Sequence, residues 1–63
     1  MLTIKPNPTK GQLYISTDLN WILLNANGQQ ILLGQGNLID LSNFANGLYF
    51  VVTSEKTFRV IKN

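Results

Sequence analysis

The sequence contains no cysteine and no histidine, and only 13% of its residues are charged. Disulfide bonds and the common zinc and thiolate sites are therefore excluded. General acid–base catalysis also lacks its commonest side chain, and the carboxylates Asp18, Asp40 and Glu55 fall on different predicted turns or strands. We therefore expect no catalytic residue, no metal ion and no cofactor in this chain.

Long apolar runs are absent too. None approaches the length of about 18 residues that a membrane-spanning helix needs, and the N-terminus lacks the pattern of a signal peptide. The formal net charge of +2 is too weak to indicate nucleic-acid binding, which needs a dense basic patch. With 44% hydrophobic residues the chain should nevertheless fold. We expect one small domain, residues 1–63.

Patterns typical of helices are scarce, because no segment places apolar residues at helical spacing between recognisable caps. Short apolar runs separated by glycine, asparagine and proline are typical of β-strands instead. We predict about seven such strands, at residues 2–5, 12–16, 20–25, 29–33, 38–41, 48–54 and 57–62. This spacing indicates an all-β fold, a small immunoglobulin-like antiparallel β-sandwich.

The turns between these strands carry clear signals. In residues 6–11, two prolines remove backbone donors and a glycine follows, which predicts a turn. Asn27-Gly28 between two apolar runs predicts a hairpin with a type I′ turn, in which both central residues have positive φ. The Gly-Gln-Gly segment at residues 34–36 predicts a flexible break between strands.

The strand at residues 48–54 is apolar on both of its faces. Alternation divides it into two sets, with Tyr49, Val51 and Thr53 on one face and Leu48, Phe50 and Val52 on the other. Gly47 followed by Tyr49 also resembles the tyrosine corner of immunoglobulin-type sandwiches, where the tyrosine hydroxyl bonds to nearby backbone. The strand is therefore either covered on both faces or exposes one face to a partner.

Taken together and in order, these motifs resemble the C-terminal sorting domains of the type IX (Por) secretion system. The opening Pro-Asn-Pro with a following Gly and Leu-Tyr-Ile, at residues 6–15, is similar to the opening of that family. The Asn-Gly hairpin, the Ile-Asp-Leu-Ser segment at 39–42 and the Gly-Leu-Tyr-Phe-Val segment at 47–51 follow in family-like spacing. The closing Arg-Val-Ile-Lys at 59–62 resembles the terminal strand, with Arg59 where lysine is usual. Val52 stands where a polar residue is common.

The resemblance implies a non-catalytic sorting signal at the tail of a larger exported protein of a Bacteroidetes-type bacterium. The implied partners are the type IX translocon, its outer-membrane shuttle protein and a cell-surface sortase that removes the tail. The cargo would pass from the periplasm to the cell surface or the medium. No nucleic-acid partner is implied, and the chain would be a monomer or a strand-mediated dimer.

Candidate recognition residues come from the motifs that carry the resemblance: Pro6, Asn7, Pro8, Gly47, Tyr49, Arg59 and Lys62. We expect the Pro-Asn-Pro turn and the glycine–tyrosine pair to be chiefly structural. Arg59 and Lys62 are the best candidates for direct contacts, although charges on a final strand also serve simply to discourage aggregation at an edge. One hypothesis is that the edge of the final hairpin docks by adding a strand to a partner sheet.

An alternative function is a fibronectin-like or carbohydrate-binding accessory module of a surface enzyme. Trp21 and Tyr14 would then be the stacking residues, because aromatic faces suit sugar rings. Chain context distinguishes the two functions, because a sorting tail must be the last domain of a large exported protein, whereas a binding module can occur anywhere in a chain.

Overall fold

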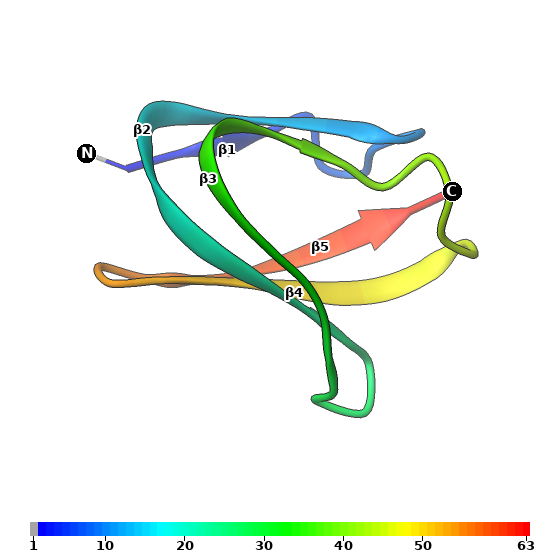
Figure 1. Ribbon diagram of the computed structural model, residues 1–63. Helices are drawn as coiled ribbons and strands as arrows, with labels where there is room; N and C mark the ends of the chain where they lie inside the picture. The colour runs from blue at the N-terminus through cyan, green and yellow to red at the C-terminus, as the bar shows by residue number, and fades with distance from the viewer. Residues whose placement is uncertain (1) are drawn as a thin grey trace.

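The computed structural model describes residues 2–63; Met1, which belongs to the predicted domain, lies outside them. These residues form a single antiparallel sheet of five strands (Figure 1). The strands are β1 (Ile4–Lys5), β2 (Gln12–Asn25), β3 (Gln30–Asp40), β4 (Gly47–Thr53) and β5 (Thr57–Lys62). Their order across the sheet is β1-β2-β4-β5, with β3 also paired to β2. The predicted all-β, antiparallel class is confirmed.

The strand number is five, and the prediction of about seven is wrong for a specific reason. The strands predicted at 12–16 and 20–25 are parts of one continuous strand, β2. Likewise, the strands predicted at 29–33 and 38–41 both belong to β3. In the β2–β3 pairing, Tyr14 lies opposite Leu38, and the next paired residue of β2 is Leu19, opposite Gly36. Between these two pairs, β2 therefore contains more residues than β3. Such a bulge bends a strand without ending it. The polar and glycine segments that predicted turns are therefore bends.

The bend folds the sheet over itself, so that two halves of one continuous sheet face each other (Figure 1). One half holds β1, the start of β2 and the end of β3; the other holds β4, β5 and the remaining parts of β2 and β3. This arrangement stands in place of the two separate sheets of the expected sandwich. The core between the halves consists of Leu2, Leu13, Ile15, Trp21, Leu23, Ile39, Leu41, Tyr49, Val51, Phe58 and Val60.

The hairpin between β2 and β3 is confirmed, but its turn is not type I′. Gly28 donates its N–H to the Asn25 carbonyl, and among the residues of this turn only Gly28 has positive φ (82°). Ala26 and Asn27 are thus the central residues of the turn, and Gly28 follows as a bulge residue. The Asn25 side chain selects this geometry, because its Oδ1 accepts the N–H groups of Asn27 and Gln29.

Position 34 requires glycine because the side chain of Trp21 packs closely against its backbone, and not because the chain must be flexible there. It lies opposite Trp21 in the β2–β3 pairing, and the indole covers its backbone. A Cβ placed on Gly34 would lie 2.3 Å from Cζ2 of the ring. Trp21 is 5% exposed, and its Nε1 has no hydrogen-bond partner in the part of the chain that the structure describes. Position 34 of the predicted flexible break is therefore a packed strand position.

Candidate recognition surface

The Pro-Asn-Pro turn reaches across the molecule and binds the last strand. The Asn7 side chain donates Nδ2–H to the Arg59 carbonyl (2.8 Å), and its Oδ1 accepts the Ile61 N–H (3.1 Å). Thr9 continues the contact with its backbone, which donates to the Ile61 carbonyl (2.8 Å) and accepts the Asn63 N–H (2.9 Å). We call this set of four hydrogen bonds from Asn7 and Thr9 to residues 59–63 the clasp.

Local hydrogen bonds hold Thr9 in position for the clasp. Its hydroxyl donates to the Gln12 carbonyl (2.6 Å) and accepts the Gly11 N–H (3.0 Å), and the residue is 1% exposed. Pro6 and Pro8 flank Asn7 at the surface, and the peptide bond before each proline is cis. The structure therefore gives Asn7 a structural role, as expected.

The clasp also changes the edge-docking hypothesis. A strand adds to a sheet through free backbone N–H and C=O groups on an edge strand. From Arg59 to Asn63, the outward groups of β5 that would accept such a strand are already bonded to Asn7 and Thr9. A strand added along this stretch of β5 would therefore have to displace the clasp. β1 and β3 also have one unpaired edge each, because within residues 2–63 each of them pairs with β2 alone.

Gly47 and Tyr49 form the predicted tyrosine corner. Tyr49 is buried, and its hydroxyl donates to the Ala45 carbonyl four residues earlier. Its ring packs against Phe44, with ring centroids 6.3 Å apart. Gly47, at the start of β4, has a φ of 148°. Both residues thus shape the entry into β4, as the pattern indicated.

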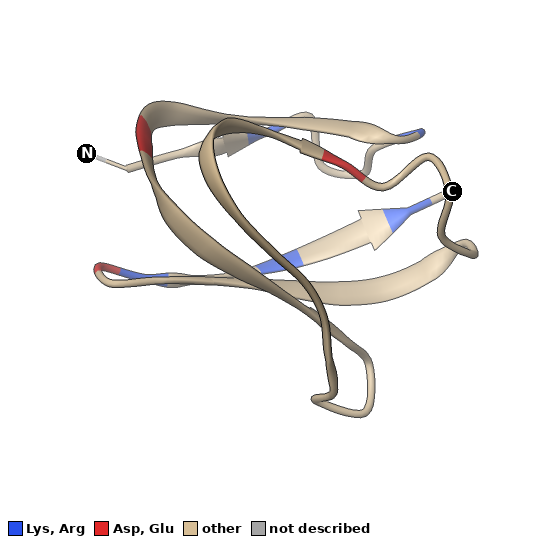
Figure 2. Ribbon diagram, in the orientation of Figure 1, with Lys and Arg blue, Asp and Glu red and all other residues tan. Residues whose placement is uncertain are grey.

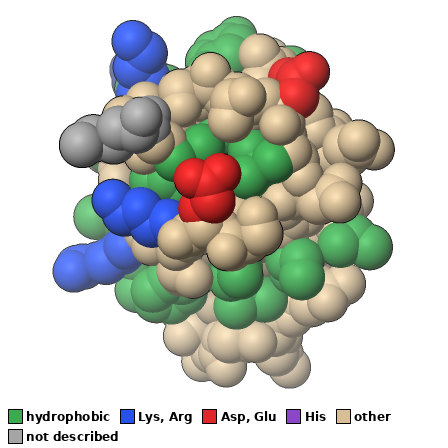
Figure 3. All heavy atoms as spheres, turned by 90° about the vertical axis from the view of Figure 1, so that its left-hand side faces the viewer, with side chains coloured by type: hydrophobic (Ala, Val, Ile, Leu, Met, Phe, Trp, Pro, Cys, Tyr) green, Lys and Arg blue, Asp and Glu red, His purple; other side chains and the backbone are tan. Residues whose placement is uncertain are grey.

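The outward side of β4 belongs to a larger apolar surface. Side chains that pair across antiparallel strands share a face, and three such rows run over the outside of this half: Leu33–Ile22–Val52, Leu24–Phe50 and Leu48–Ile61. We call these residues the outer apolar face. None of them belongs to the core cluster or packs against it. Figure 3 shows apolar side chains along the lower part of the molecule, where this half of the sheet lies.

Arg59 projects from β5, the strand at the border of this surface. It lies opposite Phe50 in the β4–β5 pairing, and Ile61 follows it on the same face. Its guanidinium makes no hydrogen bond or ion pair with the described residues. Lys62 instead donates from Nζ to Asn46 Oδ1 (3.0 Å), and Lys56 lies 5.2 Å from the centre of the Phe58 ring. Of the two predicted contact residues, Arg59 is thus the one whose charged group has no partner among the described residues.

Almost the whole sequence that carries these features matches one protein family. Residues 3–63 match the model of the secretion system C-terminal sorting domain. The chain belongs to this family. The match spans all five strands, the clasp and the tyrosine corner. No curated protein matches the chain significantly. The resemblance to type IX sorting domains is thereby confirmed, and domains of this family mark the tails of proteins exported through type IX secretion.

Three acidic residues of the sorting domain lie apart from one another (Figure 2). Asp18 is at the bend of β2, Asp40 ends β3 and Glu55 is in the β4–β5 turn. Two hydrogen bonds from Ser42 lower the pKa of Asp40, as in a turn-stabilising carboxylate. Within residues 2–63 there is no group of three or more potential metal ligands. The same residues include no helix suited to crossing a membrane.

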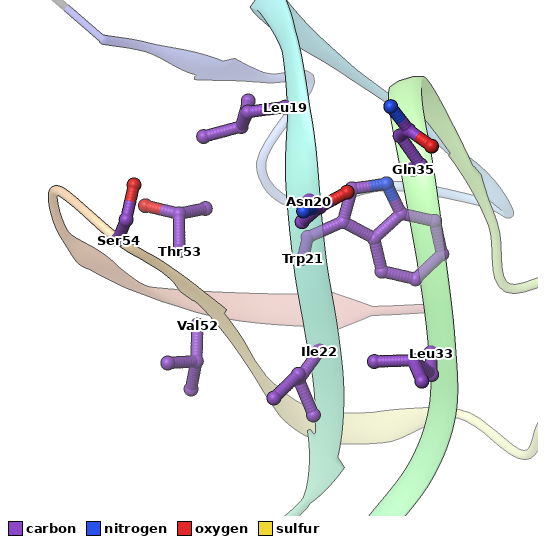
Figure 4. A pocket seen from close by; sticks show the side chains of 9 residues that line it. All are labelled: Leu19, Asn20, Trp21, Ile22, Leu33, Gln35, Val52, Thr53 and Ser54. Carbon is purple, nitrogen blue, oxygen red and sulfur yellow. The ribbon is translucent and has the colours of Figure 1, made fainter.

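A depression of about 590 Å³ marks one end of the outer apolar face (Figure 4). Ile22, Leu33 and Val52 line it, together with polar side chains such as Asn20 and Gln35. The sequence motifs did not single out this part of the sorting domain, because its residues come from three strands. The pairing of these strands was the missing information. Because Trp21 is buried in the core, it offers no exposed platform for a sugar ring.

Proposed function

We propose that the 63 residues form one sorting domain, a non-catalytic address tail of an exported protein. The tail directs its cargo to the type IX translocon, and the outer-membrane shuttle protein receives it there. The observation that carries this proposal is the family match over residues 3–63, which includes every strand of the sheet. Because the clasp joins the beginning of the domain to its end, the translocon reads a complete folded unit.

The later steps follow from the family resemblance. A surface sortase removes the tail, and the cargo is attached to the cell surface or released. These steps need no chemistry from the tail itself, which agrees with the dispersed carboxylates and the lack of cysteine and histidine. The tail acts as a monomer or as a dimer paired through another strand edge, because the clasp occupies the end of β5.

The seven candidate recognition residues divide into two roles in this proposal. Pro6, Asn7, Pro8, Gly47 and Tyr49 maintain the shape of the domain through the clasp and the corner. Arg59 contacts the secretion machinery directly, and Lys62 supports the end of β5 through Asn46. A substitution in the first group should therefore reduce sorting in proportion to the loss of folded domain.

The test is a secretion assay. Residues 1–63 are fused to the C-terminus of a periplasmic reporter that carries its own inner-membrane signal, in a host with a type IX system. We expect the reporter at the cell surface or in the medium, and in the periplasm when the host lacks its translocon. Removing residues 58–63 deletes most of β5 and the clasp, and should retain the reporter in the periplasm. A folded wild-type tail that leaves the reporter in the periplasm would contradict the proposal.

A further inference from the structure

The outer apolar face is too large and too continuous to be scattered surface hydrophobics. Its seven side chains form three adjoining rows over the four strands of one half of the sheet. Leu33 is 66% exposed and Ile61 41%, and the other five are half-buried without contact to the core. Contiguous apolar patches of this kind on a small domain are typical of interaction sites.

The opposite half of the sheet shows what an ordinary outer surface of this domain looks like. There, the exposed apolar side chains on β2 and β3 are Tyr14 and Leu38, a single cross-strand pair. Tyr14 also donates its hydroxyl to Gln12 Oε1, so its polar end is satisfied at the surface. The apolar rows are therefore specific to the half built by β4 and β5.

The charged groups on and near the outer apolar face restrict the kind of molecule that can bind there. The outer apolar face carries one charged group, Arg59, beside Phe50 and Ile61. The carboxylates lie elsewhere: Glu55 lines a separate hollow with Leu2 and Ser16, and Asp18 and Asp40 lie at the bend and at the end of β3. A guanidinium covered without a carboxylate is strongly destabilising. The group that covers Arg59 must therefore bring its own negative charge.

We propose that the outer apolar face docks on an apolar protein surface of the secretion machinery, with a carboxylate of that protein paired to Arg59. This inference rests on the proposed sorting function and names the surface that performs it. The depression beside Ile22, Leu33 and Val52 receives an apolar side chain of the partner. Arginine suits this position because its planar fork binds a carboxylate through two parallel hydrogen bonds.

Two other occupants fit less well. A second copy docked through the same face brings another Arg59 and no carboxylate, because an isologous interface repeats one surface. An anionic membrane attracts clusters of about four to eight basic residues, whereas this face has only one. A protein partner with a complementary carboxylate satisfies both the apolar rows and the lone guanidinium.

The test compares folded variants in the reporter assay. The docking variant combines Leu33→Thr with Val52→Thr, which removes two apolar side chains and keeps residues that favour strands. The matched control combines Tyr14→Thr with Leu38→Thr on the opposite half. Arg59→Glu is matched by Lys10→Glu, an exposed lysine in the turn before β2. Thermal unfolding of each purified fusion shows whether the tail remains folded.

We expect the docking variant and Arg59→Glu each to lower the secreted fraction about tenfold or more, as substitutions of interface hot-spot residues do. Arg59→Lys should give an intermediate loss, and both controls should be secreted like the wild type. If the wild-type tail is secreted and the docking variants match it, the inference is wrong although the sorting function stands. If the wild-type tail is not secreted, the proposed function itself fails.

Two further outcomes would assign the face to a different occupant and overturn the inference. One is a wild-type dimer that the docking variant converts to a monomer without loss of secretion, measured by light scattering. The other is flotation of the wild-type fusion with vesicles of anionic phospholipid that is lost in the docking variant, again without loss of secretion.

Discussion

The two faces of β4 have nearly the same hydrophobicity and entirely different surroundings. Tyr49 and Val51 point inward and are buried, whereas Phe50 and Val52 point outward and are half-exposed. Only the inner set is enclosed by the curled sheet. The comparison teaches that apolar side chains in this domain divide into those that build the core and those of the outer apolar face, which we propose as the docking surface. The same substitution, made at a residue of the same type on each face, should therefore distinguish the two groups.

Leu23 and Leu24 offer the sharpest form of this comparison, because they are adjacent leucines on opposite faces of β2. Leu23 is fully buried against Val51, and Leu24 lies beside Phe50 on the outer apolar face. We expect Leu23→Ala to cost about 2–5 kcal/mol of the free energy of unfolding, through lost burial and a cavity. This approaches the whole stability of so small a domain.

Leu24→Ala should cost about 1 kcal/mol or less, because its side chain remains partly in water in the folded state. Urea unfolding of both variants measures the difference. Equal losses would show that the outer face is also part of the folded core, and would remove the distinction between the faces.

Gly34→Ala should have the next largest effect, because the new methyl group would collide with the buried indole of Trp21. Overpacking of this kind costs about 1–3 kcal/mol. The atoms that collide belong to the six-membered part of the indole, which phenylalanine lacks at that position. In a Trp21→Phe background, the same substitution should therefore cost measurably less. A double-mutant cycle of thermal unfolding tests this coupling, and additive effects would contradict it.

The clasp should contribute less to the free energy of unfolding than a core side chain does, but more than an exposed surface side chain. Asn7→Ala removes two hydrogen bonds to the backbone of β5, each worth about 0.5–1.5 kcal/mol. We expect the loss to appear first as faster amide exchange at Ile61, whose N–H bonds to Asn7. Asn43→Ala is the control, since this exposed asparagine lies outside the clasp. Unchanged exchange at Ile61 would show that the clasp does not hold the last strand.

Most of the local structure was predictable from short-range patterns. The turns at 6–11 and around Asn27, the final hairpin and the tyrosine corner all depend on residues close in sequence. The number of strands was not predictable in this way, because polar residues and glycine signal a bend and a turn alike. In β2, the segment 16–18 is a bend and not a turn between two strands, because β3 pairs with β2 on both sides of it.

The candidate site was less predictable than the fold. Arg59 was identified from the closing motif, but the rows beside it join residues from β2, β3 and β4 that no sequence motif connects. Alternation correctly placed Phe50 and Val52 on one face. It did not show that Leu33 and Ile22 continue that face, because this depends on the register of non-adjacent strands. The role of Asn7 likewise needed the structure, since its partners are more than 50 positions away in sequence.

The smallest expected effect concerns Asp40, on the half of the sheet opposite the outer apolar face. Hydrogen bonds from Ser42 favour its ionised form and lower its pKa in the folded state below the ordinary value of 3.8. The contribution to stability is therefore complete above that ordinary value and is lost as pH falls through the lowered pKa. Because the carboxylate is fully exposed, we expect only a slight decrease of the melting temperature in this range. Asp40→Asn keeps the acceptor oxygen and cannot ionise, so its melting temperature should change less with pH than that of the wild type. Identical pH profiles for the two proteins would show that this turn contributes nothing to acid sensitivity.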